Sequence, residues 1–209
     1  MRAALLAVVL LAGVACDSAP KKGQAQARLS ETAEVPGLPA RPGATVFTFD
    51  QSRSSIEFAA AKLTRRHAGK LGRFRGSLQL LGRDATTGAV SVVVEVGSLS
   101  ADDERLTKHL KSPDFLDVER FPRARFTSTS IRAGGADGAT HTVTGNLELH
   151  GVTKQITFPA RIKVMSEAVE VTAEFSILRK DFGVYYDGVA GDLIKNDVLL
   201  MIRLDARKS

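Results

Sequence analysis

The chain has 209 residues, of which 44% are hydrophobic and 25% are charged. These values are ordinary for a globular protein and allow one domain with a sizeable core. The formal net charge of +6 is mild, and no dense Lys/Arg cluster is interleaved with aromatic residues, which argues against nucleic-acid binding. The single cysteine excludes an intramolecular disulfide and a cysteine-rich zinc site.

The N-terminus is typical of an export signal. After Arg2, residues 3–15 form an uninterrupted apolar run, which is shorter than the roughly 20 residues that a helix needs to span a bilayer. The run therefore predicts a signal peptide over residues 1–15. Cys16 then resembles the lipid-attachment cysteine of bacterial lipoproteins, although that pattern usually has Leu where Gly13 stands.

We therefore expect an exported protein that is anchored to a membrane of the bacterial cell envelope through a lipid on Cys16 and faces the periplasm. Cleavage after Ala15 without lipidation is the alternative, and it would give a soluble periplasmic protein. Residues 16–44 predict a lipidated N-terminus followed by a flexible linker, because they hold four of the seven prolines and few large apolar side chains. The folded domain is expected over residues 45–209.

Apolar and polar residues alternate along most of this domain, with the period of half-buried strands. About nine runs are expected to be strands: 46–49, 56–60, 70–80, 90–96, 124–131, 142–149, 156–164, 169–177 and 198–204. This number suits an antiparallel sandwich or barrel. A closed barrel satisfies the pattern most simply, with the apolar side chains inside and no exposed edge.

One segment breaks the alternation and predicts a short helix that starts at Ser100. Ser100 and Asp103 resemble a capping box, Leu106 and Leu110 share one face, and Pro113 ends the helix. An amphipathic helix in a chain of strands is expected to pack over an opening or an edge of the barrel.

The run HLKSPDFLDVERFPRARFTSTSI, residues 109–131, is similar to the signature of the YceI-like family. Three further pieces agree in order: HAGKLGRFRGSL (67–78), VTGNLELHGVTKQITFPA (143–160) and ILRKDFGV (177–184). The resemblance covers residues 46–206. It implies an all-β, lipocalin-like antiparallel barrel of about eight strands with one short helix inserted between two of them. It also implies an interior that holds an elongated amphiphile, such as a polyisoprenoid, an isoprenoid-quinone precursor or a fatty chain.

Small residues on the apparent inward faces (Ala60, Gly76, Gly145, Ala160 and Ala173) could leave a tunnel between phenylalanines. The residues alone favour a core that the phenylalanines fill, whereas the family resemblance favours a tunnel. The predicted ligand-binding residues are Phe58, Phe74, Val94, Leu110, Phe115, Phe126, Leu147, Phe158, Phe175 and Ile202.

The chain has four histidines, and none is spaced with another ligand residue as in a metal motif. His109 on the predicted helix either complements the helix dipole or contacts a ligand headgroup. No nucleophile elbow or phosphate-binding loop is present, so no catalytic residue, cofactor or metal is expected.

Non-catalytic binding, sequestration or transport of an apolar molecule is therefore the main hypothesis, and a homodimer is compatible with the sequence. One alternative is a structural or interaction lipoprotein with a filled barrel. Another is an enzyme that acts on a quinone precursor.

Overall fold

The computed structural model describes residues 28–30, 38–39, 41–62, 65–189 and 192–209, so the predicted signal peptide and Cys16 lie outside it. No helix among these residues is long and apolar enough to span a bilayer. The strands are β1 (Arg28–Ser30), β2 (Thr45–Asp50), β3 (Ser55–Lys62), β4 (Arg66–Leu71), β5 (Phe74–Leu80), β6 (Ala89–Glu95), β7 (Leu99–Ala101), β8 (Arg123–Ala133), β9 (His141–Leu149), β10 (Val152–Val164), β11 (Ala168–Leu178), β12 (Gly188–Val189) and β13 (Asp192–Lys208). The helices are α1 (Glu104–Lys111) and the 3-10 turns η1 (Ala85–Thr87), η2 (Val96–Ser98) and η3 (Arg179–Phe182).

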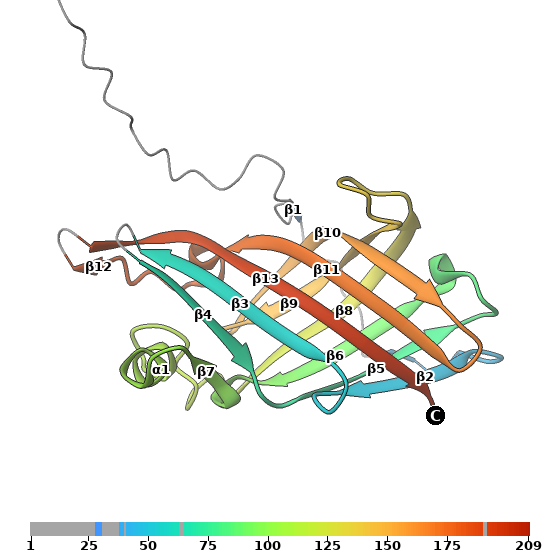
Figure 1. Ribbon diagram of the computed structural model, residues 1–209, viewed down its shortest axis with the longest axis horizontal. Helices are drawn as coiled ribbons and strands as arrows, with labels where there is room; N and C mark the ends of the chain where they lie inside the picture. The colour runs from blue at the N-terminus through green and yellow to red at the C-terminus, as the bar shows by residue number, and fades with distance from the viewer. Residues whose placement is uncertain (1–27, 31–37, 40, 63–64, 190–191) are drawn as a thin grey trace, which may run out of the picture.

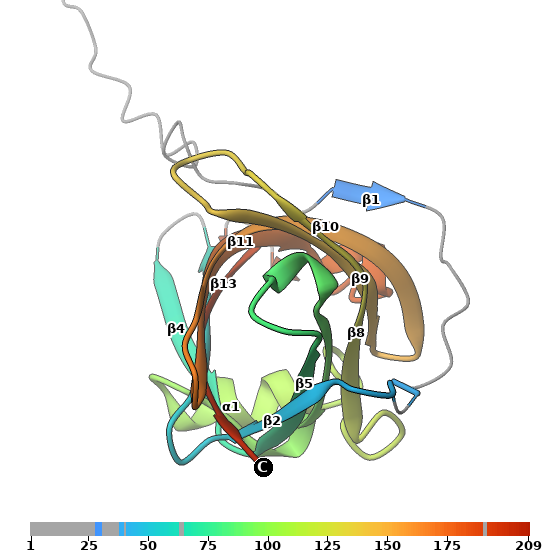
Figure 2. The ribbon, with the colours of Figure 1, turned by 90° about the vertical axis from the view of Figure 1, so that its right-hand side faces the viewer.

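The strands close an eight-stranded antiparallel barrel, because three pairs of short strands are segments of three bent strands. β13 pairs with both β2 and β3, so these two run as one strand along it. β5 and β4 pair with the other side of that bent strand, and β6 and β7 follow. β8, β9, β10, β11 and β13 complete the ring, which Figure 2 shows end-on. The predicted barrel of about eight strands is confirmed.

The bends of the three strands coincide, and they explain two differences from the predicted strands. Gly72 and Arg73 separate β4 from β5, opposite η2 in the neighbouring strand, and the Gly72 N–H donates to Ser98 O at 3.2 Å. The predicted strand 70–80 is therefore divided there and also begins earlier, at Arg66. The predicted strands 46–49 and 56–60 are two parts of one bent strand, which reduces nine strands to eight.

Arg161–Val164 of β10 pair with Val169–Thr172 of β11. The ladder between the two strands does not extend to the residues of β10 that precede Arg161. Pro159 lies two residues before Arg161 and has no N–H with which to continue that ladder. β1, in the segment predicted as a linker, pairs with β10 at residues 155–157. The η3 turn places Phe182, which is 0% exposed, in the core with Ile156.

The helix α1 lies at one end of the barrel (Figure 1), as the sequence predicted, but it begins later than expected. Asp103 is the N-cap, and its carboxylate accepts the Leu106 N–H at 2.8 Å. The predicted start at Ser100 is wrong, because the backbone of Ser100 belongs to β7 and pairs with Lys70. At the opposite end, Phe47, Leu80 and Ala206 are buried in a packed core.

Candidate ligand-binding site

Two cavities lie inside the barrel. The cavity beneath α1, here called the helix-side cavity, has a volume of about 170 Å³. The second, here called the central cavity, has a volume of about 180 Å³. Nearly all side chains that line them are aliphatic or aromatic, since the inward faces of the alternating strands converge there.

The two cavities adjoin each other and make one elongated apolar interior. Six residues line both of them: Leu71, Val94, Ala124, Leu149, Ile177 and Leu200. Taken together, the two volumes reach the lower end of the range of roughly 300–1,000 Å³ that is typical of ligand pockets. An apolar cavity of this kind stays dry and takes up apolar guests, so the interior suits a chain-like apolar ligand.

Aromatic rings form one wall of the central cavity. Phe158 stacks on Phe175 with ring centroids 4.1 Å apart, and Phe126 lies 5.6 Å from Phe158. The three rings come from β8, β10 and β11, whose inward positions alternate with polar ones. This wall is rigid, because the rings also pack against each other.

Phenylalanine rings occupy the space beside two inward glycines. A Cβ atom at Gly76 would collide with the ring of Phe49, and one at Gly145 would collide with the ring of Phe126. Neither glycine therefore borders open space directly. They let the rings lie flat against the barrel wall, and the cavities lie beyond the rings. Ala60 and Ala173 do line the cavities, whereas Ala160 is buried but lines neither.

The structure brings nine of the ten predicted ligand-binding residues to the two cavities. Phe58, Leu110 and Phe115 line the helix-side cavity, and Val94 lines both. The remaining five line the central cavity: Phe126, Leu147, Phe158, Phe175 and Ile202. Phe74 is the exception. It is 4% exposed and belongs to the packed core near Leu78, because the chain bends immediately before it at Arg73.

The helix α1 and the loop after β11 cover the helix-side cavity. Leu106 and Leu110 of α1 both line it. His109 lines neither cavity. Its Nε2 lies 3.1 Å from Asp114 Oδ2, and its ring contacts those of Phe115 and Tyr186, each with centroids 4.9 Å away. His109 therefore ties α1 to the loop that contains Tyr186, and its predicted contact with a headgroup has no counterpart in this arrangement.

Arg179 is a buried cation at the same end of the barrel, and it is not among the residues predicted from the sequence. It is 5% exposed, and its guanidinium donates to the carbonyl oxygens of Val184 (2.7 Å), Lys195 (3.2 Å) and Ile194 (3.3 Å). It also donates to Asp187 Oδ1 at 2.9 Å. Hydrogen bonds from Lys180 and Arg179 hold the pKa of Asp187 below its usual range. In the sequence, the fragment Leu-Arg-Lys-Asp-Phe indicates a polar turn at the surface, so the burial of Arg179 could not be predicted from it.

His67 is another polar residue at the cavity wall. It lies on the inward face of β4 with Leu71, and its side chain is 15% exposed. Its Nδ1 lies 3.1 Å from Oδ1 of Asp102, which immediately follows β7. The hydrogen bond with His67 is the largest cause that lowers the pKa of Asp102, so this carboxyl group is ionised and can only accept.

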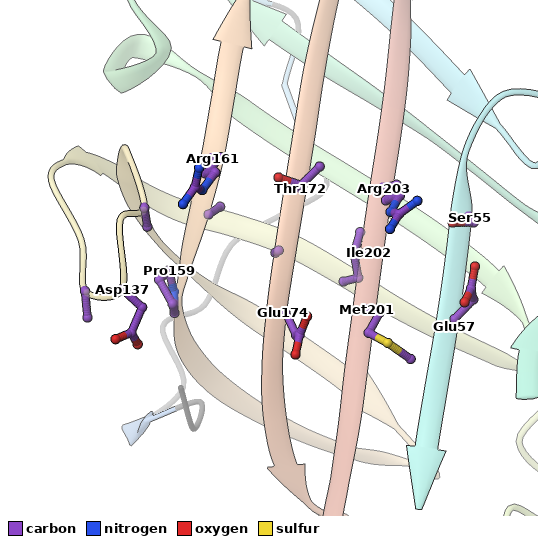
Figure 3. Close-up of a pocket in the computed structure, with 14 residues that line it drawn as sticks. Ser55, Glu57, Asp137, Pro159, Arg161, Thr172, Glu174, Met201, Ile202 and Arg203 are labelled. Carbon is purple, nitrogen blue, oxygen red and sulfur yellow. The ribbon is translucent and has the colours of Figure 1, made fainter. Parts of the chain in front are cut away.

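A larger hollow of about 700 Å³ lies on the outer face of the barrel, over β10, β11, β13 and β3. Figure 3 shows that charged side chains of both signs surround it, among them Glu57, Arg161, Glu174 and Arg203. Such a surface does not suit an apolar chain, which the interior accommodates far better.

No group of three or more His, Cys, Asp or Glu side chains that could hold a metal occurs in the described part of the chain.

The eight-stranded antiparallel barrel, with a helix inserted between β7 and β8, places the chain in the class of lipocalin-like barrel proteins. Residues 47–206 match the YceI-like domain. The chain belongs to the YceI-like family.

Two sequence relatives show the extent of the similarity. A UPF0312 protein of Pseudomonas putida strain W619 is 34% identical over 115 residues, which are 52% of this chain and 59% of the relative. Protein YceI of Salmonella arizonae is 32% identical over 120 residues, 54% of this chain and 61% of the relative. The chain thus spans only about three fifths of the length of these curated relatives.

Solved structures confirm the fold. BcnA of Burkholderia cenocepacia has a TM-score of 0.66 at 19% identity, covering 75% of this chain and 98% of its own. A polyisoprenoid binding domain from Saccharophagus degradans has a TM-score of 0.62 at 14% identity, covering 79% of this chain and 99% of its own. At these identities the likeness establishes the barrel architecture alone.

Proposed function

We propose that this protein holds an elongated apolar molecule inside its barrel and catalyses no reaction. The observation that carries the proposal is the pair of adjoining apolar cavities, which share six wall residues. Each buried methylene group of a guest contributes about 0.8 kcal/mol, so a long chain gains affinity along the whole interior. The polyisoprenoid binding domain with the same fold supports this use of the barrel.

The ligand class that fits best is a polyisoprenoid, an isoprenoid-quinone precursor or a fatty amphiphile. All three combine a long, narrow apolar chain with a small polar end. The interior suits the apolar chain, since the two cavities adjoin each other and all their lining side chains are apolar except Lys62, His67 and Arg179 in the helix-side cavity and Arg125 in the central cavity.

The protein would sequester or carry this ligand at the bacterial cell envelope. The signal peptide predicted over residues 1–15 and the resemblance of Cys16 to a lipid-attachment cysteine support this placement, with a lipid on Cys16 as the membrane anchor and a soluble periplasmic form as the alternative. The filled barrel of a purely structural lipoprotein fits less well, because the interior retains two cavities.

A matched pair of variants tests the proposal. Val92 lines the central cavity, whereas Val93, its neighbour on β6, lies on the outer face beside Arg75 and Ser91. Binding of the neutral apolar fluorophore N-phenyl-1-naphthylamine to the full chain is measured by its increase in emission. We expect Val92→Phe to fill the cavity and to weaken binding at least about tenfold, while Val93→Phe binds as the wild type does. Equal binding by both variants would reject an interior site.

A further inference from the structure

The most exposed large apolar side chains of the described residues lie at the end of the barrel that carries α1. Tyr185, in the loop before β12, is 67% exposed, and Leu193 of β13 is 51% exposed. Figure 1 shows β12 and α1 at this same end. Val46 on β2 and Leu81 after β5, at the opposite end, are less exposed, at 39% and 38%.

Tyr185 and Leu193 lie in one hairpin that borders the helix-side cavity. Leu193 pairs with Gly188, three residues after Tyr185. The chain neighbours of the two exposed residues are Val184 and Ile194, and both line the helix-side cavity. At each of these two places, one residue therefore contributes to the cavity wall while the next is exposed on the surface of the same end.

Basic residues lie beside these two side chains. Lys62 at the end of β3 pairs with Ile194, and Arg65 and Arg66 of the same β3–β4 hairpin are exposed. The segments 60–68 and 179–195, which meet at this pairing, contain six Lys or Arg residues and three Asp residues. The segment 102–114, which includes α1, contains three Lys or Arg residues and four carboxylates. The α1 end therefore keeps an excess of positive charge.

This combination of side chains is typical of a surface that lies on an anionic bilayer. A tyrosine ring is amphipathic and favours the level of the lipid head groups, whereas a leucine side chain favours the acyl boundary. Lys and Arg residues are attracted to the negative surface of anionic lipids. A stable protein interface buries roughly 800 Å² on each partner, which is far more than two exposed side chains supply.

We infer that the α1 end of the barrel docks on an anionic bilayer, with Tyr185 and Leu193 among the lipid head groups and Arg65 and Arg66 near the lipid phosphates. Docking needs no ligand inside the barrel, so it does not depend on the proposed function. It has one consequence that does rest on that function: the helix-side cavity lies next to the bilayer, from which an apolar chain can be exchanged.

The chain has no tryptophan, so a single introduced tryptophan reports only its own surroundings. Tyr185→Trp and Leu193→Trp place this reporter at the α1 end, and Leu81→Trp is the matched control at the opposite end. Each full-length variant is mixed with vesicles of phosphatidylglycerol whose acyl chains carry bromine, which quenches tryptophan on contact. We expect strong quenching in the first two variants and none in Leu81→Trp. All three share the same N-terminus, so its own affinity for the vesicle does not affect the comparison.

Charge reversal tests the contribution of the basic residues. Adding Arg65→Glu and Arg66→Glu to Leu193→Trp should reduce the quenching severalfold, because it replaces attraction to the anionic surface by repulsion. Adding Arg83→Glu and Arg132→Glu instead makes the same change in net charge at two exposed residues of the opposite end, and it should leave the quenching unchanged. Vesicles of brominated phosphatidylcholine, which has no net charge, should quench Leu193→Trp only weakly.

The outcomes separate this inference from the proposed function. Equal quenching of Leu193→Trp and Leu81→Trp, or an equal loss with the two charge-reversed pairs, would overturn docking through the α1 end. Absence of quenching in every variant would also overturn it and would favour a protein partner for this surface. Binding of N-phenyl-1-naphthylamine is measured on the same variants and should persist in all of them. Its failure in the wild type would overturn the proposed function and leave the docking result standing.

Discussion

The ring of Phe126 on β8 lies against Gly145 on the neighbouring strand β9, in the space that a side chain at residue 145 would need. The ring is thereby held flat on the barrel wall, 5.6 Å from that of Phe158. This contact keeps the middle of the barrel open, since a ring without such a recess would extend into the central cavity.

Gly145→Ala should therefore destabilise the protein. The added methyl group meets both the Phe126 ring and the carbonyl oxygen of Thr127, and such overpacking costs about 1–3 kcal/mol. Denaturant unfolding of the full chain measures the change. Gly97→Ala is the control, because nothing lies within 4 Å of a Cβ atom at Gly97. Equal losses in the two variants would show that the recess has no special role.

Asp103→Ala should weaken α1 by about 1 kcal/mol, because it removes the carboxylate that caps the Leu106 N–H. Hydrogen exchange should rise in α1 more than in β8 and β9, since the helix packs on the barrel through few residues. Glu104→Ala, which removes only an exposed pair with Lys108, should have a smaller effect. Unchanged exchange in α1 would contradict the assignment of the cap.

Arg179→Leu should lower the free energy of unfolding by about 3 kcal/mol, because it takes the donor from a buried hydrogen bond to Val184 O and from two partly buried ones to Ile194 O and Lys195 O. Lys180→Leu is a close control. Lys180 also pairs with Asp187, but its side chain is 39% exposed, so its loss should cost less than about 1 kcal/mol. Thermal unfolding of the two variants measures the difference, and Arg179→Leu should have the lower melting temperature. A lower melting temperature for Lys180→Leu would disprove the structural role of Arg179.

Asp187 should make the protein sensitive to acid. Its folded-state pKa is lowered from the ordinary value of 3.8 by hydrogen bonds from Lys180 and Arg179. A depressed carboxyl pKa contributes stability that is present above the unfolded pKa and is lost as pH falls through the folded pKa. Below about pH 4, the wild type should lose stability more steeply than Asp187→Asn. Parallel curves for the two proteins would contradict this.

The strands could be predicted from the sequence because inward and outward residues alternate without interruption, as in Val169–Ile177 of β11. The start of the helix could not be predicted, because Ser100 and Asp103 are both good N-cap residues. Only the pairing of β4 with β7 shows that the backbone of Ser100 belongs to a strand. The pairing of β1 with β10 was also not predicted, because a three-residue strand leaves no periodicity to detect.

The site was predictable to the extent that it consists of inward apolar residues. Nine of the ten predicted positions line the cavities, and Phe74 does not because of the bend at Arg73. Arg179 and His67 were missed as cavity residues for a different reason. A charged or polar side chain in a single sequence indicates solvent exposure, and its burial depends on partners such as Val184 and Asp102 that are distant in the chain or beyond a turn.

The central claim, that an apolar chain lies inside the barrel, is tested most directly by locating such a chain. Crystals of the protein grown with 16-bromohexadecanoate would show the terminal bromine by anomalous scattering. We predict a bromine peak in the central cavity, beside the rings of Phe126, Phe158 and Phe175. A bromine peak found only outside the barrel, such as in the hollow beside Arg161 and Arg203, with side chains filling the interior, would contradict the claim.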